Sequence, residues 1–251
     1  MRLAGKFAVI TGAASGFGEG IAVRFAQEGA TVVVNDINAA GSERVAAAIC
    51  RSGGKAIFCA GDVAVDADVA ALVQRATDAF GRIDVMVNNA GTTHRNRPML
   101  EVSEAEFDRI YAVNVKSLYL AARHVVPVMR RQNGGAFITI ASTAGVRPRP
   151  GLTWYNGSKG AAIVTSRSMA AELAPDRIRV NVINPVAGET GLLAEFMGGD
   201  TPELRAKFIA TIPLGRLSRP SDVAAAAVFL ASDEAAFITG ACLEVDGGRC
   251  V

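Results

Sequence analysis

The chain alternates between short apolar runs and longer stretches in which apolar residues recur every three or four positions. The short runs are rich in β-branched residues and predict buried strands. They are residues 6–11, 31–36, 55–60, 83–88, 135–140, 178–183 and 242–246. The longer, Ala-rich stretches predict helices at residues 17–29, 40–53, 66–81, 103–131, 154–174 and 221–232. Strands this uniformly apolar are typical of a parallel sheet with helices on both faces, so we predict one α/β domain over residues 1–251, built on a doubly wound seven-stranded sheet.

One segment departs from the alternation. Residues 185–213 form a long irregular insertion with short helical pieces, and we expect residues of about 187–212 to form a lid over a substrate. Its possible hinges are Gly188, Gly191, Gly198 and Gly199. Its apolar residues are Leu192, Leu193, Phe196 and Met197, which either line an apolar pocket or pack the lid itself; the sequence leaves both alternatives open.

Composition and charge exclude several classes of function. Half of the 251 residues are hydrophobic and the net charge is only +2, with acids and bases interspersed, so we expect no nucleic-acid partner. We interpret the arginines at 130–131 and at 147 and 149 as solvated loop or helix-end charge. The four cysteines form no C-x-x-C pair and have no histidine nearby, so we expect no metal. No run approaches the ~18 apolar residues of a membrane span, and the first apolar run is too short for a signal peptide, so we expect a soluble, cytoplasmic protein with no membrane partner.

A glycine-rich turn, TGAASGFG, joins the first predicted strand to the first predicted helix. Gly12 permits a tight turn, Gly16 lets the backbone approach a pyrophosphate, and Gly18 lets the helix pack closely on the strand. The helix N-terminus adds free N–H groups and the positive end of its dipole. Together with Ser15 and Phe17 of the same turn, these residues predict a site for the phosphates of a dinucleotide.

Acidic and amide side chains follow the next strands. Asp36 ends the second strand, where a carboxylate can accept hydrogen bonds from both hydroxyls of an adenosine ribose. A 2′-phosphate there would face a like charge, and neither Ser15 nor Ile37 offers a compensating cation. The sequence therefore favours NAD over NADP as the cofactor. Asp62, followed by Val63, ends the third strand, where it could accept a hydrogen bond from the adenine amino group.

These motifs, together with three later ones, resemble the short-chain dehydrogenase/reductase family over essentially the whole chain. The later motifs are NNAG, which contains Asn89, Ala90 and Gly91; a serine thirteen residues before Y-x-x-x-K; and an NP…T pattern after the sixth strand. The resemblance implies a Rossmann fold. It also implies that Asn114, Ser142, Tyr155 and Lys159 are catalytic. Pro185, Gly188 and Thr190 would contact the cofactor together with Tyr155 and Lys159.

The pair Tyr155 and Lys159 has a chemical rationale of its own. The two residues lie one helical turn apart, on the same face of the predicted helix. Interconverting an alcohol and a carbonyl requires a proton to move together with the hydride, and a free tyrosine with a pKa of ~10 is a poor base at neutral pH. A nearby ammonium is expected to lower the pKa of Tyr155. The resemblance adds that Lys159 bonds the nicotinamide ribose and connects through a water to Asn114, while Ser142 orients the substrate oxygen.

The sequence departs from the family pattern in two places. Phe17 stands where the family commonly has isoleucine. Val186 stands where the usual N-P-G pattern has glycine, which puts the backbone geometry after Pro185 in doubt, although Gly188 could restore flexibility. Thr190 keeps the spacing expected for bonding the nicotinamide carboxamide or the phosphates.

The most favoured function is that of an NAD-dependent oxidoreductase that interconverts a secondary alcohol and a ketone on a small-molecule substrate. The chain also resembles 3-oxoacyl-carrier-protein reductases, which are usually NADP-dependent and dock an acidic carrier on arginines such as Arg130, Arg131 and Arg177. A non-catalytic, nucleotide-binding relative is the third alternative. Polar contacts to the substrate are expected from Thr93, His94 or Trp154, and the substrate itself is not identified.

Two helical stretches are too apolar to face water alone: the one beginning at Tyr155, and the run Ala224–Leu230. Relatives commonly form tetramers through a helix pair and through the last helix and strand. We therefore expect a homotetramer, with Cys250 and Val251 near a subunit boundary. The alternative is that both stretches only cover the sheet within one subunit.

Overall fold

A single parallel sheet runs through the molecule. The structure is a computed structural model that describes residues 1–251. The strands are β1 (Phe7–Thr11), β2 (Thr31–Asp36), β3 (Lys55–Ala60), β4 (Val85–Asn88), β5 (Gly135–Ile140), β6 (Ile178–Pro185) and β7 (Cys242–Val245). They pair in the order β3-β2-β1-β4-β5-β6-β7, and every pairing is parallel. The predicted seven-stranded, doubly wound sheet is confirmed, and the strand order reverses between β1 and β4.

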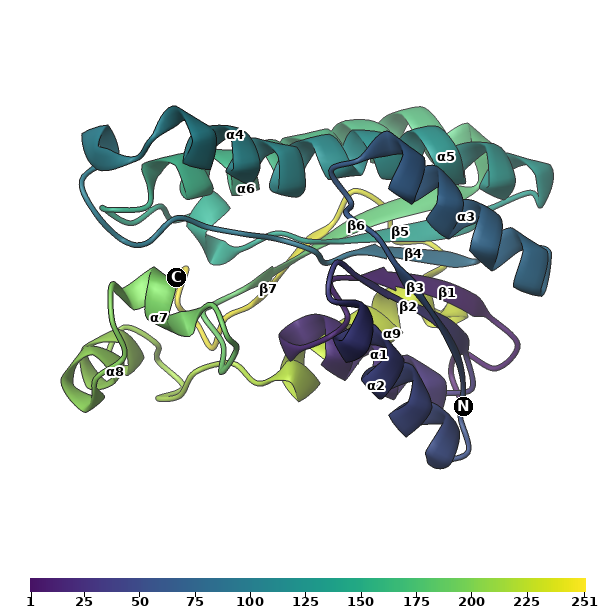
Figure 1. The fold of residues 1–251 in the computed structure, drawn as a ribbon, viewed down its shortest axis with the longest axis horizontal. Helices are drawn as coiled ribbons and strands as arrows, with labels where there is room; N and C mark the ends of the chain where they lie inside the picture. The colour runs from purple at the N-terminus through teal and green to yellow at the C-terminus, as the bar shows by residue number, and fades with distance from the viewer.

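Helices cover both faces of this sheet (Figure 1). One layer contains α1 (Gly16–Gln27), α2 (Ala39–Arg51) and α9 (Pro220–Ala231), and the other contains α3 (Asp66–Phe80), α4 (Glu104–Tyr111), α5 (Ser117–Arg131) and α6 (Thr153–Leu173). Two short helices, α7 (Leu193–Met197) and α8 (Pro202–Ile209), lie beyond the sheet at one end, close to the C-terminus. None of the helices is both long enough and apolar enough to cross a membrane.

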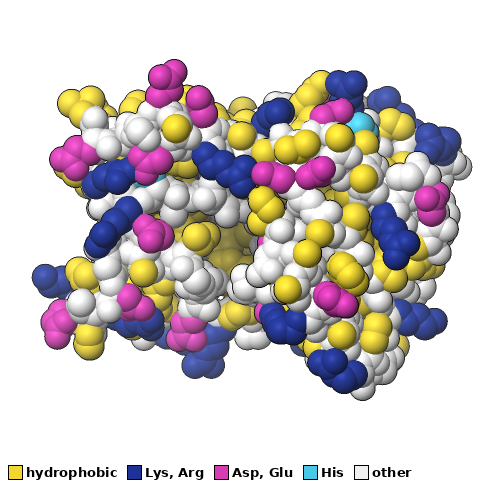
Figure 2. Space-filling view, in the orientation of Figure 1, with side chains coloured by type: hydrophobic (Ala, Val, Ile, Leu, Met, Phe, Trp, Pro, Cys, Tyr) yellow, Lys and Arg dark blue, Asp and Glu magenta, His cyan; other side chains and the backbone are white.

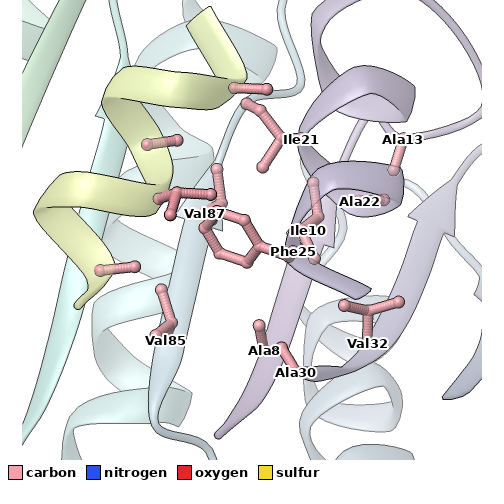
Figure 3. Packing of buried hydrophobic residues seen from close by; sticks show 14 of the residues in the cluster. Ala8, Ile10, Ala13, Ile21, Ala22, Phe25, Ala30, Val32, Val85 and Val87 are labelled. Carbon is pink, nitrogen blue, oxygen red and sulfur yellow. The ribbon is translucent and has the colours of Figure 1, made fainter. Parts of the chain in front are cut away.

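The larger hydrophobic core lies between the sheet and the layer of α1, α2 and α9. It contains 25 buried residues, with Phe25 of α1 at its centre between Val87, Ile10 and the neighbouring α9 (Figure 3). A second cluster of 17 buried residues fills the opposite face, under α3, α5 and α6. Burying apolar surface on both sides of the strands is what makes their sequences uniformly apolar.

The predicted helix 103–131 contains a π turn. The backbone stays helical from Glu104 to Arg131, which confirms the predicted stretch, and the π turn at Ala112–Lys116 joins α4 to α5. The extra residue of a π turn shifts the helix register, and such turns are frequent at functional sites. Here the turn carries Asn114, which is buried and faces the loop after β4.

The insertion has a small core of its own, and Val186 is part of it. Val186 is 3% exposed and clusters with Leu193, Ile212 and Leu217. Its backbone does not adopt a positive φ, so this position does not need a glycine. Its carbonyl accepts a hydrogen bond from the Ser218 hydroxyl at 3.0 Å. A valine here therefore ties the insertion to the sheet by packing.

The apolar run of α9 is mostly used within the chain. Ala224, Ala227, Val228 and Leu230 are buried in the larger core, where α9 packs on α1, and Ala225 is the exposed member of the run. Most of this run therefore covers the sheet within the subunit.

Candidate active site

A cavity of about 330 Å³ opens at the carboxyl ends of the central strands, where a doubly wound sheet places its ligands. Figure 2 shows a hollow in this face of the molecule. Fourteen of the predicted site residues line the cavity: Gly12, Ser15, Gly16, Phe17, Asp36, Asn89, Ala90, Gly91, Ser142, Tyr155, Lys159, Pro185, Gly188 and Thr190. Five predicted residues lie outside this lining: Gly18, Ile37, Asp62, Val63 and Asn114.

The glycine-rich turn needs its glycines because chain segments meet there without room for side chains. Gly12 has a φ of +63°, and a Cβ on it would lie 2.7 Å from the Ala90 backbone. A Cβ on Gly18 would lie 2.2 Å from the Gly12 carbonyl oxygen. Gly18 is thus required for the shape of the turn although it does not line the cavity. The backbone left exposed at the start of α1 fits a pyrophosphate.

The loop after β4 is fastened to the turn after β1. The Asn89 carboxamide donates to the carbonyls of Thr11, at 2.8 Å, and of Gly12, at 3.0 Å. The Thr11 hydroxyl accepts from the amides of Asn89 and Ala90, both at 3.1 Å. These bonds hold the two loops at the reversal point of the sheet in one fixed arrangement.

Asp36 is the last residue of β2 and lies at the far end of the cavity from Tyr155 along the sheet. One carboxylate oxygen accepts from the Ala14 amide at 3.1 Å, and the other from the Asn38 amide at 3.0 Å. The sequence did not point to Arg44 as a cation in this region, and Arg44 donates to the carbonyl of Ala14 at 2.9 Å. Arg44 also pairs with Glu19 at 2.8 Å, so its charge is already compensated.

The predicted adenine contacts have other partners in the structure. Asp62 accepts from the Ala64 amide at 2.9 Å and from the Arg109 guanidinium at 2.9 Å. Burial opposes its ionisation, but the Ala64 amide and the Arg109 charge outweigh burial and hold the pKa of Asp62 below its ordinary value. Val63 is buried against Val113, and Ile37 is exposed beside Asp36.

Tyr155 lies in the first turn of α6 and is buried at one end of the cavity, its ring centroid 5.1 Å from that of Phe196. Burial raises the pKa of Tyr155 to about 12, while the neighbouring Ser142 hydroxyl and the Arg149 charge lower it. That Lys159 lowers this pKa stays a prediction, and Arg149 is a second cation that lowers it.

Lys159 follows one turn later on α6 and is 5% exposed. Its ammonium donates to the Ile140 carbonyl at 3.0 Å and lies 5.8 Å from the centre of the Tyr155 ring. Burial lowers the pKa of Lys159 to about 8. Gly91 passes close to the ammonium, since a Cβ there would lie 3.3 Å from Nζ. Lys159 therefore points toward the loop after β4 as well as toward the cavity.

Asn114 links three elements by its carboxamide. Its nitrogen donates to the Thr92 carbonyl and to the Ser158 hydroxyl, both at 2.9 Å, and its oxygen accepts from the Thr92 amide at 2.8 Å. Asn114 thus fixes α6 against the loop that carries Gly91, and its connection to Lys159 through a water stays a prediction.

The insertion closes one side of the cavity beside Tyr155. Leu192 and Phe196 line the cavity, whereas Leu193 and Met197 pack in the core of the insertion. Of the four apolar residues, two therefore line a pocket and two pack the lid itself. Gly188 is fixed by packing, since a Cβ there would lie 2.4 Å from the Phe17 ring. The larger aromatic at position 17 is therefore accommodated by the lack of a side chain at position 188.

The expected polar contacts to the substrate do not line the cavity. Trp154 donates to the Met99 carbonyl at 3.1 Å, His94 is buried beside Arg95, and Thr93 bonds the His94 carbonyl. Three arginines line it in their place: Arg147, Arg149 and Arg249. Arg147 is an exposed loop residue at the rim of the cavity, as expected for solvated charge, whereas Arg149 is half-buried, so the interpretation as solvated charge is wrong for Arg149. The sequence signal that could have pointed to Arg149 is its place between two prolines, six residues before Tyr155.

Comparison with known proteins finds relatives over almost the whole chain. The family model described as enoyl-(acyl carrier protein) reductase matches residues 12–249. The chain is 51% identical to 4-formylbenzenesulfonate dehydrogenase of Comamonas testosteroni, over 99% of each chain. The chain belongs to the short-chain dehydrogenase/reductase family.

Two solved structures share the fold closely. One is 3-ketoacyl-(acyl-carrier-protein) reductase from Brucella melitensis complexed with NADH, with a TM-score of 0.93, 47% identity and coverage of 99% of this chain and 100% of that one. The other is 7α-hydroxysteroid dehydrogenase complexed with NADH and 7-oxo glycochenodeoxycholic acid, with a TM-score of 0.93, 40% identity and coverage of 98% and 95%. This short-chain dehydrogenase/reductase is thus a nicotinamide-dependent oxidoreductase of alcohol and carbonyl substrates.

Proposed function

We propose that this enzyme uses NAD to interconvert a secondary alcohol and a ketone, with Tyr155 as the acid/base. The observation that carries the proposal is the placement of a buried tyrosine, beside Ser142 and one turn before Lys159, in a cavity that also reaches the glycine-rich turn and Asp36. The two ends of the cavity match the two tasks of holding a dinucleotide and moving a proton.

Each residue of the site has its own role in the proposed reaction. A bound nicotinamide supplies or accepts the hydride. Tyr155 donates its phenol proton to the substrate oxygen in reduction and accepts a proton in oxidation. Ser142 donates a hydrogen bond that orients the same oxygen. Lys159 holds the cofactor ribose, and Asn114 keeps α6 in place against the loop beneath it.

NAD is favoured over NADP by the surroundings of Asp36. The carboxylate is fixed by the Ala14 and Asn38 amides, and a 2′-phosphate beside it would meet a like charge. Arg44 is paired with Glu19 and bonds the Ala14 carbonyl, so a 2′-phosphate would compete with the Glu19 carboxylate for this cation. The two solved relatives were both obtained with NADH, which agrees with this choice for the chain.

A second candidate is the reduction of a 3-oxoacyl thioester on a carrier protein, because one solved relative at 47% identity is named for that reaction. The surface arginines offer limited support for it. Arg130 is paired with Asp176 at 2.7 Å, which leaves Arg131 and Arg177 of the expected docking group. A non-catalytic nucleotide-binding role is the third candidate, and it would leave Tyr155 without a use.

The test is a substrate panel with both cofactors. Ketones, secondary alcohols, polyols and acyl thioesters are offered with NAD(H) and with NADP(H), and the change in NADH absorbance is followed. We expect turnover of ketones or alcohols with NAD(H). Tyr155→Phe is expected to lower kcat at least tenfold while NADH binding, followed by fluorescence, changes little, because only the phenol oxygen is removed. Retention of more than about a tenth of the activity would exclude Tyr155 as the principal acid/base.

A further inference from the structure

Three arginines meet at the end of the cavity that holds Tyr155. Arg147 and Arg149 belong to the segment between β5 and α6, and Arg249 belongs to the segment after β7. The two segments touch, because the Arg147 guanidinium donates to the Arg249 carbonyl. The end of the chain therefore forms part of the wall beside the acid/base tyrosine.

Arg149 is the arginine most enclosed by this arrangement. Its guanidinium carbon lies 4.6 Å from the centre of the Phe208 ring, on the insertion. Burial lowers its pKa, the Arg249 charge lowers it further, and Tyr155 acts in the opposite direction. Arg149 thus lies between the phenol, a second guanidinium and an aromatic ring.

The positive charge here has no partner in the protein. Arg147, Arg149 and Arg249 take part in none of the ion pairs of the molecule. The only carboxylate in the cavity wall is Asp36, at the opposite end. A partly buried cation without a carboxylate costs folding free energy, and that cost is offset when a bound anion accepts its hydrogen bonds.

The rest of the wall at this end is apolar. Leu192, Phe196 and Phe208 come from the insertion and line the same cavity, with the Phe196 ring tilted by 57° against that of Tyr155. The phosphates of the cofactor belong at the glycine-rich turn and the start of α1, so they do not need these arginines. An apolar body of the substrate can lie between the rings, with its charged group on Arg149.

We propose that the substrate carries an oxyanion, a carboxylate or a sulfonate, on a flat apolar body, and that Arg149 binds this anion with support from Arg249. The proposal rests on the proposed function, because it places the reacting carbonyl at Tyr155. Arg149 is a substrate-binding residue in it, and its electrostatic effect on Tyr155 is a separate consequence of the same position.

Three matched ketones test the proposal: 4-acetylbenzoate, 4-acetylbenzenesulfonate and the neutral isostere 4-acetylbenzamide. The full-length enzyme is loaded with NADH, the binding of each probe is measured from NADH fluorescence, and kcat/KM is measured for its reduction. We expect at least one anionic probe to bind at least tenfold more tightly than the amide, and the comparison of carboxylate with sulfonate identifies the preferred anion.

The variants are Arg149→Gln, Arg149→Lys and Arg249→Gln, with Arg131→Gln as a control that removes one exposed charge away from the cavity. We expect Arg149→Gln to weaken binding of the preferred anion by about 10- to 100-fold and to change binding of the amide by less than about threefold. Arg149→Lys should recover part of the loss, and Arg131→Gln should change nothing. If Arg149→Gln fails to fold, Arg249→Gln carries the same comparison with a smaller expected effect.

The outcomes separate this proposal from the proposed function. Three results would overturn the anion site. They are an equal affinity for the amide and both anions, no binding of any probe, and an equal loss of affinity for all three probes in Arg149→Gln. The equal loss would leave Arg149 acting only through Tyr155. Anion-selective binding that depends on Arg149 without turnover of any ketone would support the site and count against the proposed reaction.

Discussion

At the scale of single residues, Lys159 is a buried cation kept at a cost to stability. Burial lowers its pKa to about 8, from an ordinary value near 10.5, so the folded state resists protonation of this side chain. Its hydrogen bond to the Ile140 carbonyl recovers only part of that cost. Below pH 8 the ammonium is charged in both the folded and the unfolded protein, and the folded protein is destabilised by the full amount. This destabilisation disappears as the pH rises through 10.5, because the amine is then neutral in both.

We therefore expect Lys159→Met to raise the free energy of unfolding by about 2 kcal/mol at pH 7 while it abolishes activity. The gain should shrink as the pH rises from 8 to 10.5. Denaturant unfolding of both proteins across that range measures it. Arg131→Met, which removes an exposed cation, is the control and should show no such pH dependence. A variant less stable than the wild type at pH 7 would show that the charge is compensated in the protein.

Asp36 gives a second prediction at this scale. We expect NAD to bind at least tenfold more tightly than NADP, and Asp36→Ala to narrow the difference, because the charge beside the 2′-position is removed. Asp36→Asn should narrow it too, while keeping an acceptor for the Ala14 amide. Fluorescence titration with both reduced cofactors measures the ratio, and Asp78→Ala on α3 is the control. Equal affinities in the wild type would contradict the role given to Asp36.

Single residues also show where sequence reasoning stops. Tyr155, Ser142, Lys159 and the glycine-rich turn could be predicted because their order and spacing follow from helix geometry and from the resemblance. The position of Arg149 could not, because it depends on the C-terminal segment packing against the segment between β5 and α6, where Arg147 bonds Arg249, a contact between residues far apart in the chain. The effect of burial on the pKa of Tyr155 could not be predicted either, because spacing places Lys159 nearby but does not show how deeply the phenol is buried.

At the scale of elements, the seven strands and the six main helical stretches were predictable from periodicity, since each buries a continuous apolar face. The π turn at Ala112–Lys116 was not, because its apolar pattern continues from α4 into α5 and its cause is tertiary. Asn114 bonds Thr92 and Ser158 from this turn, and neither partner is near it in sequence.

The insertion gives the prediction at this scale. Val186→Gly restores the glycine of the family pattern but removes a buried side chain from the cluster with Leu193 and Ile212. We expect a loss of about 1–3 kcal/mol in stability, a higher KM and faster proteolysis within residues 187–212. Val65→Gly, at the exposed N-cap of α3, is the matched control. Unchanged proteolysis and KM in Val186→Gly would show that Val186 does not hold this segment over the cavity.

At the scale of the whole molecule, two surfaces remain apolar after the chain has folded. Small residues mark the outer face of α6 at spacings of three and four, with Val164 at its centre and 65% exposed. The second surface lies at the β7 edge of the sheet, where Leu243 is 38% exposed and Phe237 is fully exposed. A sheet edge and a helix face of this kind are suited to self-association through two-fold axes.

We therefore predict a homotetramer built from an α6 interface and a β7-edge interface, with Val251 near a boundary. Val164→Arg should divide it into dimers, because each two-fold contact between α6 helices would then bury two like charges. Light scattering at micromolar concentration measures the mass, and Ser52→Arg, which adds the same charge at the exposed end of α2, should leave it unchanged. If the wild type is a dimer and Val164→Arg turns it into monomers, only the α6 interface forms and the β7-edge interface does not. A wild-type monomer would contradict the assembly, and the apolar face of α6 would then need a different partner.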